Sequence, residues 1–343
     1  MWARIGDKCF YDESNGVLKS DVRIHRMIIP KFQLDKERKY TICARKIIER
    51  KPYYTETDEV EEFTFDFCPA DGDTIRAYHI ADAHNMVQCP AKAAKAYGKI
   101  DLLIMNGDLP DHSGNVENMI TIYELAQETT GGNIPIIFSR GNHDMRGNCA
   151  EHFAEFTPND NGNTYYTIRS GGLWALVLDC GEDKDDARVE YGNTICCHAF
   201  RERETEFIKN VIKNANDEYL AEGVKHRVII CHNPFTRKMK NSFNIEEEIY
   251  TLWAKLLREN IKPDLMICGH THRLMIDPIG GENDGLGQPC SVLIGAEPEF
   301  YDPKVSDKKS FKGAGLSFSD KGIEVTFTNC SGESWGKKVL KEY

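Results

Sequence analysis

The sequence of 343 residues lacks any long apolar segment. No stretch approaches the roughly 20 uninterrupted apolar residues that a membrane-spanning helix requires. The first residues, Met1 to Asp7, also lack the apolar core of a secretory signal. These two absences predict a cytoplasmic protein that does not bind membranes.

Basic residues are in the minority. Lys and Arg together number 43 against 54 Asp and Glu, which gives a formal charge of −11. Proteins that bind nucleic acids generally draw much of their affinity from Lys and Arg at phosphates, so we expect no general nucleic-acid binding. The negative charge does not exclude an enzyme that acts on small phosphates, because a bound metal ion can reverse the local field.

The twelve cysteines contain no CxxC pair, and Cys196 and Cys197 are adjacent. This spacing suits neither a zinc ribbon nor a redox motif. We therefore expect reduced thiols, as in a cytosolic protein. The sequence also has no internal repeat and no low-complexity tract.

The first part of the chain favours strands. Apolar and polar residues alternate around Tyr40 to Ala44 and around Phe63 to Phe67, a pattern typical of half-buried antiparallel strands. Pro69-Ala70-Asp71-Gly72-Asp73 then interrupts the pattern. We predict a small β domain over residues 1–72 and a second domain over residues 73–343.

After this boundary, short apolar strands alternate with helical patterns, and the C-terminal part returns to strands. The expected strands are 75–80, 102–105, 134–138, 173–178, 228–231, 265–268, 291–294, 315–318 and 323–328, and the expected helices are 116–127, 204–215 and 246–257. Asp320-Lys321-Gly322 between the last two strands is a hairpin signal. This order predicts an α/β core with two packed sheets.

Five of the expected strands end in residue types that bind metals. The segments are Asp82-Ala83-His84, Gly107-Asp108-Leu109-Pro110-Asp111, Gly141-Asn142-His143-Asp144, His232-Asn233-Pro234 and Gly269-His270-Thr271-His272. In open α/β sheets, residues just beyond the carboxyl ends of strands form the binding crevice. Each segment alone has an ordinary structural explanation, but five of them in this order predict one common site.

The spacing within these segments suggests how they face the site. On a locally extended chain, residues two apart point to the same side, so Asp82 with His84, and His270 with His272, would each face one centre. Asn142 and the residue after it, His143, should point apart. We therefore expect one of the two to be a ligand and the other to be left free for substrate.

The motifs contain more potential ligands than one zinc ion binds. At least two carboxylates, one amide and four imidazoles are available, whereas a tetrahedral zinc takes four ligands. The set suits two cations that share a carboxylate, as in phosphoryl displacement. Nitrogen and oxygen ligands without thiolate favour manganese, iron or zinc over magnesium or calcium.

On these five motifs the sequence resembles the calcineurin-like metallophosphoesterase superfamily over residues 73–343. The resemblance implies a four-layer α/β/β/α sandwich with a dinuclear centre. It also implies a role for each residue of the motifs: Asp82, His84 and His272 on one metal, Asn142, His232 and His270 on the other, Asp108 as the bridge, His143 as the catalytic histidine and Asp111 as its orienting carboxylate.

Differences from the usual motifs indicate to which subfamily of this superfamily the chain is similar. Purple acid phosphatases usually have glycine where this chain has His84 and a tyrosine ligand where it has Asp111, so we expect a related branch without the purple tyrosine. Ser/Thr protein phosphatases usually read Asp-Arg-Gly and Gly-Asn-His-Glu, whereas here Asp111 is followed by His112, and Asp144 ends the third motif. The part before residue 73 resembles the small fibronectin type III-like domain that precedes some purple-acid-phosphatase-like domains.

The expected activity is hydrolysis of a small phosphomonoester or phosphodiester. A metal-bridged hydroxide would attack, and His143, as an imidazolium, would be the general acid. The alternatives are a protein phosphatase or nuclease of the same superfamily, or a non-catalytic metal-binding scaffold. A degenerate scaffold is expected to have lost ligands, and this chain has kept all of them.

Several residues near the motifs are candidates for substrate binding. Residues 180–200 form either a solvated acidic loop or a lid over the metals. The candidates are Asn142, Arg146 after the third motif, Arg273 after the fifth, His112, and Tyr191, Asn193 or His198 from the long loop.

Overall fold

The computed structural model describes residues 1–300 and 310–341, which form two compact units. The first unit comprises Met1–Pro69 together with Thr130–Pro135, and the second comprises Ala70–Thr129 and the chain from Ile136 onward. The inclusion of Thr130–Pro135 in the first unit was not part of the predicted division.

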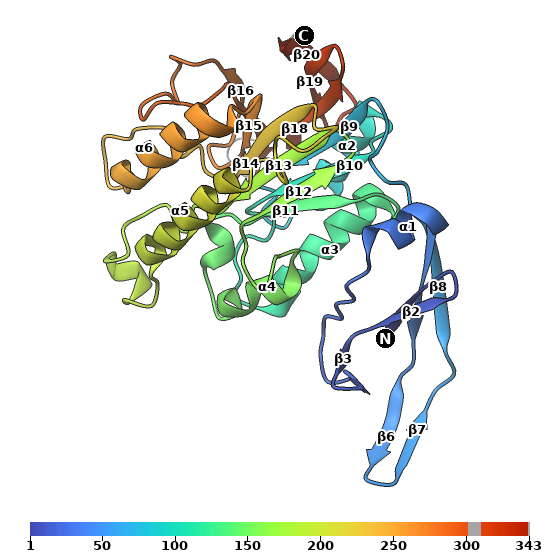
Figure 1. Cartoon of the computed structure of the whole chain (residues 1–343). Coiled ribbons are helices and arrows are strands. Elements are labelled where there is room, and N and C mark those ends of the chain that lie inside the picture. The colour runs from blue at the N-terminus through green and yellow to red at the C-terminus, as the bar shows by residue number, and fades with distance from the viewer. Residues whose placement is uncertain (301–309, 342–343) are drawn as a thin grey trace. The chain divides into compact units, whose positions relative to one another are not determined.

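The first unit is built from antiparallel strands (Figure 1). Its main sheet has the order β2-β1-β5-β8, with β1 at Trp2–Ile5, β2 at Lys8–Tyr11, β5 at Lys39–Ala44 and β8 at Glu61–Asp66. Two hairpins, β3 (Glu13–Ser14) with β4 (Val17–Leu18) and β6 (Ile47–Lys51) with β7 (Tyr54–Thr57), and the helix α1 (Lys31–Glu37) complete it.

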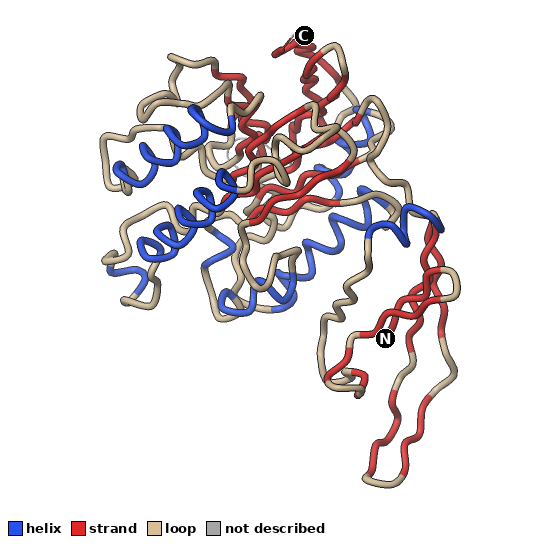
Figure 2. Tube along the Cα trace, in the orientation of Figure 1, coloured by secondary structure: helices blue, strands red, loops and turns tan. Residues whose placement is uncertain are grey.

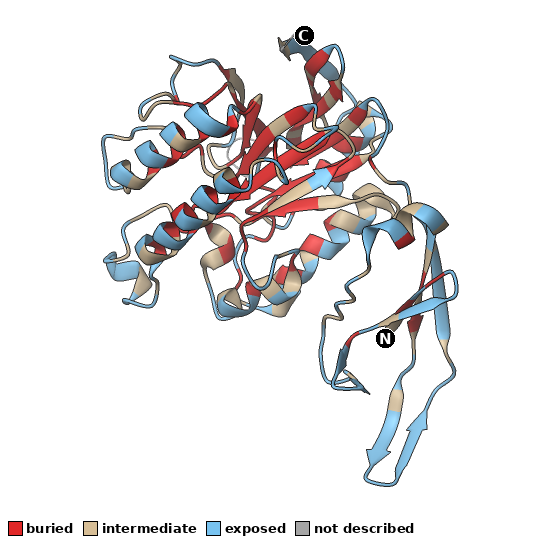
Figure 3. Ribbon diagram, in the orientation of Figure 1, coloured by how far each residue is buried: buried red, intermediate tan, exposed pale blue. Residues whose placement is uncertain are grey.

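The sequence pattern and the structure differ in detail here. The alternation in β5 is present, and its buried residues are Thr41 and Cys43, whereas Tyr40, Ile42 and Ala44 are only partly buried. Phe63 in β8 is half exposed, and the β6–β7 hairpin is exposed along nearly its whole length (Figure 3). The resemblance of this unit to a fibronectin type III domain stays a prediction.

In its described part, the second unit contains one large sheet of twelve strands. Nine follow the order β11-β10-β9-β18-β17-β15-β14-β13-β12, β16 pairs with β17, and β19 and β20 continue from β18. The bounds are β9 Ile75–Ile80, β10 Leu102–Asn106, β11 Ile136–Ser139, β12 Tyr166–Ser170, β13 Leu173–Leu178, β14 His226–Cys231, β15 Leu265–Cys268, β16 Arg273–Asp277, β17 Val292–Glu299, β18 Ser310–Ser319, β19 Gly322–Asn329 and β20 Ser334–Lys341. The predicted hairpin is present, since Ser319 pairs with Gly322.

Within residues 70–300 and 310–341, six α- and π-helical segments and three short 3-10 turns accompany this sheet. Figure 2 shows helical segments beside the strands. They are α2 Gln88–Tyr97, α3 Val116–Thr130, α4 Phe153–Phe156, α5 Cys197–Lys213, α6 Glu247–Leu256 with the π-helical turn η4 Leu257–Ile261, and the 3-10 turns η1 His143–Met145, η2 Ala150–His152 and η3 Val189–Tyr191. Among the described residues, no helix is both long and apolar enough to cross a membrane.

The sheet curls so that its two halves face each other. Alternate residues of β9 and β10, such as Ala77 and Ile104, pack with alternate residues of β13 and β14, such as Val177 and Ile230, in one core. The outer face of the first half packs against α2 and α3, and that of the second half packs against α5 and α6. Figure 3 shows the buried strands between helices whose outer faces are exposed. The predicted four-layer α/β/β/α sandwich is confirmed.

Candidate metal centre

The five motifs follow strands of both halves of the sheet. β9, β10 and β11 run parallel to one another, as do β13, β14, β15 and β17, so each half presents its carboxyl ends together. The side chains of the motifs gather into groups whose potential ligand atoms lie within 4.8 Å of one another. These groups are Asp82, His84 and His272; Asp108, His232 and His270; and an overlapping set of His84, Asp111 and His143.

The first group is centred on Asp82, which is fully buried. Asp82 Oδ1 lies 3.4 Å from His272 Nε2, and His84 Nε2 lies 3.3 Å from the same nitrogen. Both oxygens of Asp82 accept the backbone N–H of His270, at 3.0 and 2.9 Å. The three side chains are those that the resemblance implies for one metal.

The second group is centred on His232. Its Nε2 lies 3.1 Å from Asp108 Oδ2 and 3.6 Å from Asp82 Oδ1, so both carboxylates approach one ring. His270 Nδ1 lies 2.9 Å from Asn142 Oδ1, which brings the predicted amide ligand into the same place. Asp82 and Asp108 both lie near the two groups, since the charge of each acts on His84 and His272 as well as on His232.

The contacts of His232 show that these residues fit a cation. Its Nδ1 donates to the backbone oxygen of Asn106 at 2.7 Å, so the proton of the neutral ring is on Nδ1. Nε2 is buried, has no hydrogen-bond partner and faces two carboxylates. In the neutral ring a lone pair would face carboxylate oxygens, which is repulsive, so this position requires a positive charge: a proton in the metal-free site, or a metal ion when one is bound.

The charges of this second group reinforce one another. Burial alone would lower the pKa of His232, but the nearby Asp108 and Asp82 outweigh it and raise the pKa to about 10. Burial would raise the pKa of Asp108, yet the surrounding histidines, His232 foremost, lower it. The pocket therefore favours charged carboxylates and attracts positive charge.

The backbone around the motifs is unusual. Five predicted ligands have positive φ, namely Asp82 (53°), His84 (42°), Asp108 (53°), His270 (68°) and His272 (51°). Such left-handed conformations cost residues other than glycine about 1–3 kcal/mol each and cluster at functional sites. A Cβ atom at Gly141 would collide with Asp108 Oδ1, which explains the glycine there.

This backbone corrects our argument from spacing. We expected Asp82 with His84, and His270 with His272, to share a side because the chain is extended. The chain instead turns at each of these residues, and His270 and His272 join different groups.

His143 lies beside the metal groups with both ring nitrogens engaged. Its backbone N–H donates to Asp108 Oδ1 at 2.9 Å. Its Nδ1 lies 2.8 Å from the backbone oxygen of Asp111, and its Nε2 lies 3.1 Å from Arg146 Nη1. A carbonyl oxygen only accepts and a guanidinium only donates, so these are the contacts of a neutral ring rather than of the expected imidazolium.

Asp111 does not make the contact that we predicted. We expected its carboxylate to orient His143, but its backbone oxygen does so. The carboxylate lies 3.3 Å from His84 Nδ1 instead. The tight turn after β10 directs the carbonyl of Asp111 toward one histidine and its side chain toward the other.

Arg146 is held by the segment that begins at Cys180. Its Nε and Nη2 donate to Glu182 at 2.7 and 3.0 Å, and Nη2 also donates to Asp183 at 3.2 Å. The hydroxyl of Tyr191 donates to Glu182 at 2.7 Å. The sequence indicated Arg146 and Tyr191. It did not single out Glu182 or Asp183, because a run of acidic residues gives no signal that separates a buried carboxylate from a solvated one.

Two more residues were missed. Asp144 is fully buried and accepts the backbone N–H groups of Gly141 at 2.7 Å and Asp108 at 3.2 Å, so it joins the second and third motifs. Burial, with the charge of Asp108, raises its pKa to about 8. Phe300 lies against the first group, with its ring centre 5.3 Å from that of His84 and 5.8 Å from that of His272.

Three other candidates for substrate binding are not brought to these groups. His112 contacts Gly114 and Asn118 at the start of α3. His198 lies at the start of α5, 3.0 Å from Glu246. Arg273 is engaged by both oxygens of Glu282, at 2.8 and 3.2 Å. Each of the three lies in or near a motif or the long loop in sequence. Its side chain nevertheless contacts residues outside the two metal groups. Asn193 occupies a left-handed turn (φ 58°) between η3 and α5.

Comparison with known families agrees with this geometry. The family model for calcineurin-like phosphoesterases matches residues 75–274, the part of the chain that carries all five motifs. The chain belongs to this family. It is a metal-dependent phosphoesterase, and the two groups of ligand atoms suggest a centre of two divalent ions.

Solved structures share the fold of this phosphoesterase. A purple acid phosphatase from yellow lupin (Lupinus luteus) seeds has 16% identity and a TM-score of 0.53, covering 87% of this chain. A dimetal phosphatase from Danio rerio has 11% identity and a TM-score of 0.50, covering 80% of this chain and 100% of its own. The chain spans 59% of the length of the lupin protein. No curated protein matches the sequence.

Proposed function

We propose that this phosphoesterase hydrolyses a small phosphomonoester or phosphodiester at a centre of two divalent cations. Asp82, His84 and His272 would hold one cation, Asn142, His232 and His270 the other, and Asp108 would contact both. The observation that carries the proposal is the position of His232 Nε2, which lies 3.1 and 3.6 Å from the buried carboxylates of Asp108 and Asp82. Manganese, iron and zinc suit this donor set.

The bound cations would supply positive charge for phosphoryl oxygens and a water of lowered pKa. The protein's own contribution is to fix the surrounding groups. Asn106 holds the tautomer of His232, and the backbone N–H of His143 holds one oxygen of Asp108, leaving the other for metal. In both cases a backbone group, and not a flexible side chain, fixes the orientation of the ligand.

His143 is the proposed proton donor to the leaving oxygen. The carbonyl of Asp111 fixes the ring through Nδ1 and leaves Nε2 toward the site. For Nε2 to carry a proton, the guanidinium of Arg146 must leave it, since a donor and a proton cannot share one lone pair. A negatively charged phosphoryl group is the partner that would draw Arg146 away and stabilise the new position.

The test is hydrolysis of p-nitrophenyl phosphate and bis-p-nitrophenyl phosphate after loading with Mn²⁺, Fe²⁺ or Zn²⁺. Asp108→Asn should lower activity by about a hundredfold or more, because several kcal/mol of charge stabilisation depend on the metals. Asp320→Asn is the matched control, since this exposed carboxylate in the β18–β19 turn lies 2.8 Å from the surface Lys225 and belongs to neither metal group. The ratio of the two rates distinguishes a monoesterase from a diesterase. Absence of hydrolysis with two ions bound would contradict the proposal and favour a scaffold.

A further inference from the structure

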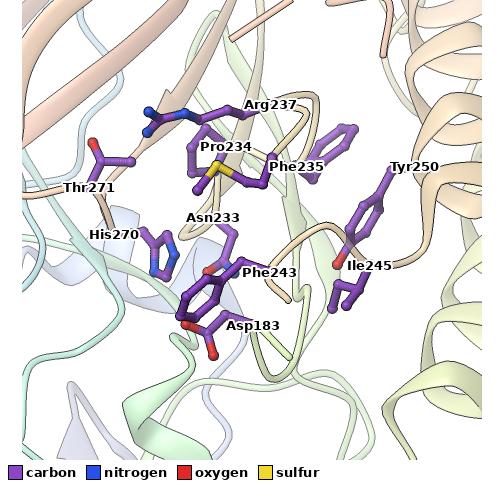
Figure 4. Close-up of a pocket in the computed structure, with 11 residues that line it drawn as sticks. Asp183, Asn233, Pro234, Phe235, Arg237, Phe243, Ile245, Tyr250, His270 and Thr271 are labelled. Atoms are coloured by element: carbon purple, nitrogen blue, oxygen red, sulfur yellow. The ribbon is translucent and has the colours of Figure 1, made fainter. Parts of the chain in front are cut away.

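A cavity of about 320 Å³ opens beside the second metal group. This volume is near the lower end of the range for small-molecule sites. Figure 4 shows His270 and Thr271 on one side of the cavity and Tyr250 with Ile245 on the opposite side. Most of its lining is apolar or aromatic: Pro234, Phe235, Met239, Phe243, Ile245 and Tyr250.

The cavity is continuous with the proposed catalytic centre through two residues. His270 lines it and also belongs to the group of Asp108 and His232. Asp183 lines it as well and accepts from Arg146, whose guanidinium also contacts His143. A phosphoester bound between His270 and His143 therefore has this cavity as a neighbour for one of its ester groups.

The apolar walls are preformed. The ring of Phe235 lies 5.5 Å from that of Tyr250 and 5.6 Å from that of the fully buried Trp253, and these rings hold one another in place. Phe243 is 39% exposed and forms a more accessible part of the lining. Three aromatic rings in one small cavity favour a planar guest, because stacked and edge-to-face contacts add to the hydrophobic gain.

The charged groups of the lining are already paired. Arg237 donates to Glu282 at 2.9 Å, and Asp183 accepts from Arg146. Two uncharged atoms are buried without a hydrogen-bond partner, Asn233 Oδ1 and Thr271 Oγ1, and both residues line the cavity beside His270. The cavity therefore suits an uncharged ring with a polar edge better than a second anionic group.

We propose that this cavity binds an aromatic ester group of the substrate, so that the enzyme prefers aryl or heteroaryl phosphoesters to alkyl ones. This inference rests on the proposed function and names the substrate class of that site. The cavity holds the ring between its aromatic walls, and the partly buried Asn233 and Thr271 lie beside it.

The test measures binding of phosphonates, which are not hydrolysed, to protein loaded with Mn²⁺ and freed of excess metal. Phenylphosphonate, cyclohexylphosphonate and methylphosphonate are compared by isothermal titration calorimetry. We expect phenylphosphonate to bind about tenfold more tightly than methylphosphonate, since burial of a ring is favourable. Cyclohexylphosphonate should fall between them.

Two variants locate the effect. Phe243→Ala should weaken phenylphosphonate about fivefold and leave methylphosphonate unchanged, because it removes one aromatic contact. Trp335→Ala is the matched control, since Trp335 is also 39% exposed but does not line the cavity. It should change neither affinity, and thermal unfolding checks that both variants are folded.

The outcomes separate the two proposals. Equal binding of phenyl- and methylphosphonate would overturn the cavity proposal while the metal centre stands. Cyclohexylphosphonate binding as tightly as phenylphosphonate would overturn the aromatic assignment. Failure of all three to bind would remove this inference together with the proposed function.

Discussion

His143 is the residue at which chemistry and metal binding can be separated. It contacts Asp108 through its backbone and not through its ring, so truncating the ring leaves the metal groups in place. We expect His143→Ala to lower kcat by about 10²–10⁴-fold, the usual contribution of a general acid, with two metal ions retained. Metal analysis and kinetics of the variant check this.

The control for this prediction is His152→Ala, an exposed histidine beside Glu151 and Glu155. Its activity and metal content should match those of the unaltered protein. If His143→Ala lost both metals, the ring would be a ligand and not a proton donor.

Asp111 has two separable roles, one for its carbonyl and one for its carboxylate. Asp111→Ala keeps the carbonyl contact to His143 but removes the carboxylate beside His84. We expect metal affinity to fall about 10–100-fold, as it does when a group that supports a ligand is lost, with kcat at saturating metal nearly unchanged. Activity measured against Mn²⁺ concentration gives both values. A large loss of kcat with unaltered metal affinity would show that the carboxylate orients His143 after all.

Glu204 makes stability depend on pH at a position outside the motifs. It is fully buried in α5, accepts the backbone N–H of Asp179 at 2.8 Å through Oε1, and has no partner for Oε2. Burial, with the charge of Asp179, raises its pKa well above the usual range. The folded state therefore holds this proton at pH values where the unfolded chain releases it, and wild-type stability falls as pH rises above about 4.3 toward the folded pKa.

Glu204→Gln removes this titration. Relative to the wild type, the variant should gain about 1 kcal/mol or more in free energy of unfolding between pH 5 and pH 8, because one pKa unit corresponds to about 1.4 kcal/mol. Urea unfolding of the metal-free proteins at the two pH values measures the difference. A difference between the proteins that does not change with pH would show that Glu204 titrates normally.

At the scale of elements, α5 depends on the long loop before it. Asp186 accepts the backbone N–H groups of Cys197 and His198, both at 3.0 Å, and so caps the helix from eleven residues away. We expect Asp186→Ala to lower the free energy of unfolding by about 1 kcal/mol, the usual value of an N-cap. Glu206→Ala, which removes an exposed ion pair with Lys209 on the same helix, should cost less than about 0.5 kcal/mol. Equal effects in thermal unfolding would argue against the cap.

Strands of the second unit could be predicted from sequence better than helices or loops. The expected ranges of β9, β13 and β15 coincide with the structure. For β13 and β15 the reason is that a continuous apolar run in a fully buried strand has sharp ends. α5 begins at Cys197 and not at Glu204, since its cap comes from a distant residue that no local pattern reveals. The alanine- and lysine-rich α2 and the exposed β20 contain few large apolar residues and were missed.

At the scale of the whole molecule, the motifs identified which residues meet, but the sequence could not supply how they meet. Strand order brings the ends of β9, β10, β14 and β15 to one place, and this follows from the fold class. The orientation of each ligand depends on left-handed turns, and the partners of Arg146 depend on the path of the loop after β13. Neither feature can be predicted from apolar periodicity, because that pattern indicates which residues are buried and not where a polar side chain points.

Because the ligands come from strands throughout the second unit, metal binding should stabilise that unit as a whole. A ligand at 100 times its Kd adds about 2.7 kcal/mol to the free energy of unfolding. We expect Mn²⁺ to slow amide hydrogen exchange in β9, β10, β14 and β15, whose ends carry Asp82, Asp108, His232 and His270. β5 and β8 of the first unit contain none of these ligands and should exchange at the same rate with Mn²⁺ or EDTA.

Hydrogen exchange followed by mass spectrometry measures the rates of these two sets of strands separately. Protection gained equally in β5 and β8 would mean that the units unfold together, and protection gained at the motif turns alone would mean that the cations order only local loops.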